Sequence, residues 1–132
     1  FEHMGNDVYA LARGGQFGRF DITTGEFTAI GNTPVPNGNG CGLALLGNTM
    51  FAACLDRIMQ INITTGALGA QVAIAPPNVG GFSPHISDMR ALDGILYGVT
   101  SLGELLTINP TNGITATVED FGIPVSAMEI FQ

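Results

Sequence analysis

The sequence contains no lysine and no tryptophan, and only 11% of its residues are charged. Four arginines stand against eleven acidic residues, so the net charge is -7 at pH 7. An acidic surface repels phosphate groups, and we therefore expect neither nucleic acid nor membrane as a partner. The chain also lacks an apolar run of about 18 residues and a basic opening segment followed by an apolar one, so we expect no membrane span and no signal peptide.

A chain of 132 residues suits one domain with a single hydrophobic core. The dipeptide His3-Met4 is typical of a cloning site, so we expect residues 1–4 to be vector-derived residues and the start Met, and residues 5–132 to be the domain. Cloning of this kind can remove an export signal. Localisation therefore stays open, with a soluble secreted or periplasmic protein favoured over a cytoplasmic one.

Glycine and proline are abundant, with 19 and seven residues, and turn residues occur from end to end. This composition argues against helix bundles, coiled coils and α/β sheets with long crossover helices, and it predicts an all-β fold. An internal repeat narrows the prediction. A turn segment ending in glycine occurs three times, at intervals of 41 and 47 residues: 21–25 (Asp-Ile-Thr-Thr-Gly), 62–66 (Asn-Ile-Thr-Thr-Gly) and 109–113 (Asn-Pro-Thr-Asn-Gly).

Two further runs also occur three times each. One places an aromatic residue at the same point upstream of each turn: Tyr9, Phe51 and Tyr97. The other occupies residues 41–46, 87–92 and 126–131. Repeats in the forties that consist of short, evenly spaced strands are typical of β-propellers, in which each blade has four strands. The sequence therefore predicts a β-propeller with three blades per chain.

The expected strands do not fill the three blades in simple order. The first blade has only three expected strands (7–12, 17–23, 26–30), whereas the second (41–46, 49–55, 58–63, 68–74) and third (86–92, 95–100, 105–109, 114–119) have four. One more strand, 125–131, ends the chain and corresponds to the inner strand that the first blade lacks. We therefore expect this last strand to complete a first blade.

Three blades are fewer than the four to eight that propellers typically need for closure. We expect a self-assembling homodimer that forms a six-bladed propeller, in which the last strand of each chain completes blade one of its partner. Met128 and Ile130 on that strand, and Val8 and Tyr9 on the strand that it would pair with, are the expected assembly residues. The alternative is that the chain is half of a longer natural propeller.

The third blade carries Tyr97-Gly98, followed by Leu105-x-x-Ile108-Asn109 and the glycine turn. This pattern resembles the blades of bacterial β-propeller proteins, broadly those of NHL-like and quinoprotein-like type, over essentially the whole chain after Met4. The Gly-His and Trp-Asp signature of WD repeats is absent. Quinoprotein blades have recurrent tryptophans, which this sequence lacks, and we expect no cofactor.

Cys41 and Cys54 are the only cysteines. If Gly47-Asn48 is a two-residue turn, the two cysteines face each other on adjacent strands as a non-hydrogen-bonded pair, the arrangement in which side chains approach most closely. A cross-strand disulfide is then geometrically feasible. Two small buried thiols are the alternative, and the sequence leaves the two open.

The expected ligand-binding residues belong to the longest connections and the strand that follows one of them: Asn37, Asn78, Phe82, His85 and Asp88. A metal or acid-base site needs convergent His, Asp and Glu from several blades. At the inner strand ends only His85, Asp88 and Glu129 are available, so we expect no metal and no catalytic residue. Arg57 and Glu104, in the second turn of their blades, are expected to be solvated surface charges.

Two function classes follow. We favour a non-catalytic binding module whose rigid blades display variable loops toward a peptide, a glycan or a small molecule. The alternative is a propeller enzyme of the lyase, lactonase or hydrolase kind, with a metal ion in the central channel.

Overall fold

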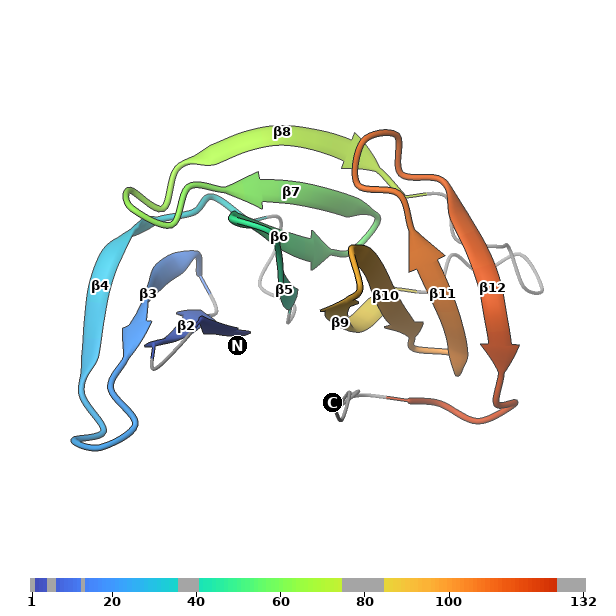
Figure 1. Ribbon diagram of the computed structural model, residues 1–132, viewed down its shortest axis with the longest axis horizontal. Coiled ribbons are helices and arrows are strands. Elements are labelled where there is room, and N and C mark those ends of the chain that lie inside the picture. Colours follow the sequence, from blue (N-terminus) through green and yellow to red (C-terminus); the bar gives the residue numbers. More distant parts are fainter. Residues whose placement is uncertain (1, 5–6, 13, 36–40, 75–84, 126–132) are drawn as a thin grey trace.

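The computed structural model describes residues 2–4, 7–12, 14–35, 41–74 and 85–125. These residues form three four-stranded antiparallel sheets, each with its strands in chain order. The three sheets fan around a common centre as half a ring, with β4, β8 and β12 on the outside (Figure 1). Blade one consists of β1 (Glu2–Met4), β2 (Asp7–Leu11), β3 (Gln16–Phe20) and β4 (Phe27–Asn32). Blade two consists of β5 (Gly42–Leu46), β6 (Thr49–Cys54), β7 (Arg57–Ile61) and β8 (Leu68–Ala73). Blade three consists of β9 (Ile86–Leu92), β10 (Ile95–Thr100), β11 (Glu104–Ile108) and β12 (Thr115–Asp120).

This arrangement confirms the predicted all-β propeller fold with three blades.

The repeated turn between the third and fourth strands of each blade, which we call the outer turn, explains why the sequence repeats there. Asp21, Asn62 and Asn109 each accept a hydrogen bond from the backbone N–H two residues later, at 2.7 to 2.9 Å. The glycine that ends each outer turn has a φ between 73° and 75°. A short side-chain acceptor and a glycine with positive φ are therefore required at the same places in every blade.

One prediction about blade one was wrong. We expected the last strand of a second chain to form its inner strand. Instead, β1 occupies that place, with Glu2 opposite Tyr9 and Met4 opposite Asp7. Pairing depends on the backbone, so residues 2–4 fill the position without carrying the recurrent run. The strand expected at 125–131, including Met128 and Ile130, lies outside the described residues apart from Val125.

The core lies between the blades, because neighbouring sheets pack face to face. Alternate residues of β6 point to opposite neighbours: Met50 and Ala52 belong to the cluster with blade one, and Phe51 and Ala53 belong to the cluster with blade three. Tyr9 is 7% exposed and packs in the first of these clusters, so it contributes to the core of its own chain. The middle blade is thus covered on both faces, as its run of buried apolar residues requires.

The blades also meet at the outer edge of the half ring, through a contact that occurs twice among the described residues. Thr33 follows β4, and its hydroxyl donates a 2.7 Å hydrogen bond to the carbonyl oxygen of Gly66 in the outer turn of blade two. Ile74 follows β8, and a Cβ added at Gly113, in the outer turn of blade three, would collide with the carbonyl oxygen of Ala73. We call this contact the rim joint: the residue after one blade's outermost strand, packed against the outer turn of the next blade.

A disulfide joins Cys41 to Cys54, across the start of β5 and the end of β6. The register of these strands, with Gly42 opposite Ala53, extends to the two cysteines. Their Cα atoms are 4.5 Å apart, the spacing of a non-hydrogen-bonded antiparallel pair. Cys54 is 1% exposed, so the bond fixes the innermost strand of blade two to the core.

We expect the double substitution Cys41→Ser and Cys54→Ser to lower the free energy of unfolding by about 3 kcal/mol. The reason is that the bond closes a loop between residues 13 apart and removes entropy from the unfolded chain. Urea unfolding of the oxidised protein, of the reduced protein and of the variant checks this. Equal midpoints for all three would show that the disulfide contributes nothing to stability.

Candidate functional site

The structure describes two of the five expected ligand-binding residues. His85 precedes β9, is exposed, and is tied to the second turn of blade three: its N–H donates to Ser101 Oγ at 3.3 Å, and its carbonyl accepts from Ser101 N–H at 2.8 Å. Asn37, Asn78 and Phe82 lie outside the described residues.

Asp88 forms an ion pair on the innermost strand of blade three. Its Oδ1 accepts from Arg90 Nη1 at 3.0 Å, and both side chains are only 15% exposed. The same guanidinium donates to the carbonyl oxygen of Met89 at 2.8 Å. A partly desolvated pair with extra hydrogen bonds holds its geometry better than a surface pair. The pairing with Arg90 therefore gives Asp88 a structural role in β9.

The prediction that Glu104 is a solvated surface charge was wrong. This residue is 6% exposed, and its Oε2 has no hydrogen-bond partner among the described residues. The equivalent Arg57 does have an exposed side chain, at 53%. Strand alternation does not explain the difference, because Glu104 shares a strand face with the buried Leu106 and Arg57 shares one with the buried Met59. Within the described ranges, no three His, Cys, Asp or Glu residues lie close enough to hold a metal ion.

Each blade has a groove between its outer turn and the start of its second strand. The groove of blade one has a volume of about 590 Å³, and those of blades two and three have about 460 Å³ each. The lining residues correspond by strand register. Asp7, Thr49 and Ile95, for example, each begin the second strand of their blade. The fold therefore repeats one concave shape three times.

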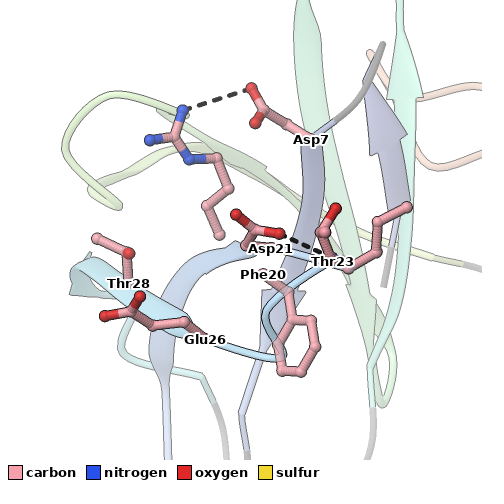
Figure 2. Close-up of a pocket in the computed structure, with 8 residues that line it drawn as sticks. Asp7, Phe20, Asp21, Thr23, Glu26 and Thr28 are labelled. Atoms are coloured by element: carbon pink, nitrogen blue, oxygen red, sulfur yellow. Dashed lines mark hydrogen bonds and ion pairs between the residues drawn. The ribbon is translucent and has the colours of Figure 1, made fainter.

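The chemistry of the groove changes from blade to blade. In blade one, the lining includes Asp7, Arg19 and Glu26, and Arg19 pairs with Asp7 at 3.4 Å (Figure 2). In blade two, the lining is uncharged and polar: Asn48, Thr49, Gln60, Asn62 and Thr64 contribute. In blade three it is largely apolar, with contributions from Leu46, Ile95, Pro110, Ile114 and Ala116. Equivalent positions in the three blades thus present charged, polar and apolar surfaces.

Asp21 lines the groove of blade one, and hydrogen bonds from the backbone lower its pKa. The backbone N–H groups of Thr23 and Thr24 donate to its Oδ1 at 2.7 and 3.1 Å. These bonds favour the carboxylate, so they hold the pKa of Asp21 below its ordinary value of 3.8.

We expect Asp21→Asn to reduce the acid sensitivity of the protein. A group whose pKa is lowered by folding adds stability above its ordinary value of 3.8 and loses that stability as the pH falls through the lowered pKa. Asparagine, which is native at positions 62 and 109, accepts the same bonds without titrating. Thermal unfolding should therefore show a smaller drop in Tm for the variant on acidification below 3.8. Parallel drops would contradict this.

Three four-stranded blades around one centre place the chain in the β-propeller class. No family model matches the sequence, and no curated protein matches it. Solved structures do share the fold.

Three of these structures show the extent of the likeness. Glutaminyl cyclase from Myxococcus xanthus has a TM-score of 0.64 at 17% identity, over 86% of this chain and 48% of that one. BamB from Moraxella catarrhalis has a TM-score of 0.59 at 14% identity, over 98% of this chain and 37% of that one. The computationally designed Ika4 protein has a TM-score of 0.56 at 17% identity, over 99% of this chain and 78% of that one. The chain thus spans less than half of the two natural propellers.

No helix in the described ranges combines the length and the apolar character that crossing a membrane requires.

Proposed function

We propose that this chain is half of a β-propeller that pairs with a second copy to form a closed six-bladed ring, and that the ring is a non-catalytic binding module. The observation that carries the proposal is the half ring itself. Blade one and blade three are its two ends, and both ends open toward the same side (Figure 1). A second half ring related by a two-fold axis would place its blade one against blade three of the first copy, and its blade three against blade one of the first copy. Two copies would then form a closed ring.

The three grooves support the binding role. In binding proteins, a rigid scaffold holds variable side chains at fixed positions. Here the groove lies at the equivalent place in each blade, and its lining changes from Arg19 and Glu26 in blade one to Gln60 in blade two and Ile114 in blade three. A closed ring would offer six grooves in two sets. A peptide, a glycan or a small molecule with both charged and apolar groups suits such a series.

The disulfide supports a location outside the cytoplasm. Disulfides persist in oxidising compartments and are rare in the cytosol. A bond between Cys41 and Cys54 that is buried in the core therefore fits a secreted or periplasmic protein.

We expect the native mass of the purified protein to be about twice the chain mass of 13.7 kDa. Native mass spectrometry and light scattering over a range of concentrations provide the measurement. A monomer at every concentration would overturn the proposed ring, and a mass of three or more chains would overturn the six-bladed closure.

Selection of phage-displayed random heptapeptides on the immobilised protein tests the binding role. We expect enriched sequences whose binding is lost in the groove variant Gln60→Ala with Ile114→Asp. The change Val118→Asp, at an exposed residue outside the linings given above, is the matched control. Absence of enrichment, or enriched peptides that bind all variants equally, would count against the grooves as a peptide-binding surface.

A further inference from the structure

The residue after the outermost strand is fixed in the same way in all three blades. The N–H groups of Thr33, Ile74 and Phe121 each donate to a carbonyl oxygen in the second turn of the same blade. The acceptors are Gly15, Asp56 and Gly103, at 2.6, 2.7 and 2.8 Å. The three residues are therefore structurally equivalent, and differences in their exposure reflect what packs on them.

Their exposure differs sharply. Thr33 is 0% exposed and Ile74 is 5% exposed, because each lies in a rim joint with the next blade. Phe121 is 48% exposed, although it is an apolar residue and the largest of the three. Phe121 therefore corresponds to one half of a rim joint, and no outer turn within the described residues covers it.

The residues that form the other half of a rim joint are exposed in blade one. Gly66 and Gly113 end the outer turns of blades two and three and are buried in rim joints. Gly25 ends the outer turn of blade one and is exposed, with no described heavy atom within 4 Å of the position of an added Cβ. The same contrast applies to the last residue of the third strand. Phe20 is 38% exposed, whereas its equivalents Ile61 and Ile108 are each 3% exposed.

We infer that Phe121 is a docking residue for a second copy of this chain, and that the outer turn Asp21–Gly25 of that copy packs on it to form a third rim joint. The inference rests on the proposed ring and assigns its contact. The partner is a second copy because this chain contains both parts of a rim joint in an exposed state: Phe121 and the outer turn of blade one. They are equivalent to the residues that form the two joints within the chain. Both halves lie at the open ends that face the same side in Figure 1, so one two-fold axis forms two joints at once.

The charges at this joint make it sensitive to salt. Glu119 and Asp120 precede Phe121, and Asp21 and Glu26 flank the turn that would dock there, so carboxylates gather on both sides. Like charges repel, and salt screens the repulsion over a distance of about 10 Å at 0.1 M. Raising the salt concentration should therefore tighten the dimer, the opposite of the usual effect on an interface held by ion pairs.

The test uses two pairs of variants in the full chain. Phe121→Asp should raise the dissociation constant of the dimer by about tenfold or more, because it places a carboxylate in an apolar contact. Val118→Asp, which changes an exposed apolar residue of the same outer strand, should leave the dimer unchanged. Gly25→Ala should weaken the dimer, whereas Gly94→Ala, at a glycine with similar positive φ and an equally open Cβ position, should not.

Sedimentation velocity over a dilution series measures each dissociation constant, and circular dichroism checks that each variant is folded. A wild-type protein that is always monomeric would overturn the proposed ring, and this joint with it. A dimeric wild type whose constant is unchanged by Phe121→Asp and by Gly25→Ala would leave the ring standing and overturn the joint. Equal weakening by Val118→Asp or Gly94→Ala would also overturn it, since the effect would not be specific to the two halves.

Discussion

Packing between blades is the interaction on which the rest of this structure depends. A four-stranded sheet has two faces and no interior, so each blade buries its apolar side chains only against its neighbours. The middle blade shows the consequence: Phe51 packs toward blade three and Met50 toward blade one, and both are nearly inaccessible. The outer turns and the disulfide stabilise blades whose positions are set by this packing.

Because blades bury their apolar residues against each other, apolar residues are exposed in blades one and three. Among the described residues, no blade packs on the outward face of blade one or of blade three, so residues with buried equivalents are exposed there. Phe20 and Phe121 are the clearest cases, at 38% and 48%. Exposed apolar residues at sheet ends favour association, and in the proposed ring a second copy covers them.

The outer turns show how much a sequence can reveal when its requirement is local. Asp21 and Gly25 are needed for hydrogen bonds and dihedral angles within five residues, so the motif recurs and predicts the blades. The sequence also predicted that Cys41 and Cys54 face each other, because a two-residue turn sets the register of the strands beside it. Glu104 was out of reach. Its burial depends on how blade three sits in the assembled fold, and its charge points to the opposite conclusion.

The sequence by itself determined the number of blades, most strand positions and the acidic character of the surface, since these follow from periodicity and composition. Only the tertiary structure decided that β1 fills the inner position of blade one, because backbone pairing accepts residues that no motif marks. It also decided which equivalent positions are covered. Thr33 and Phe121 occupy the same place in their blades, and only the presence of a following blade makes one buried and the other exposed.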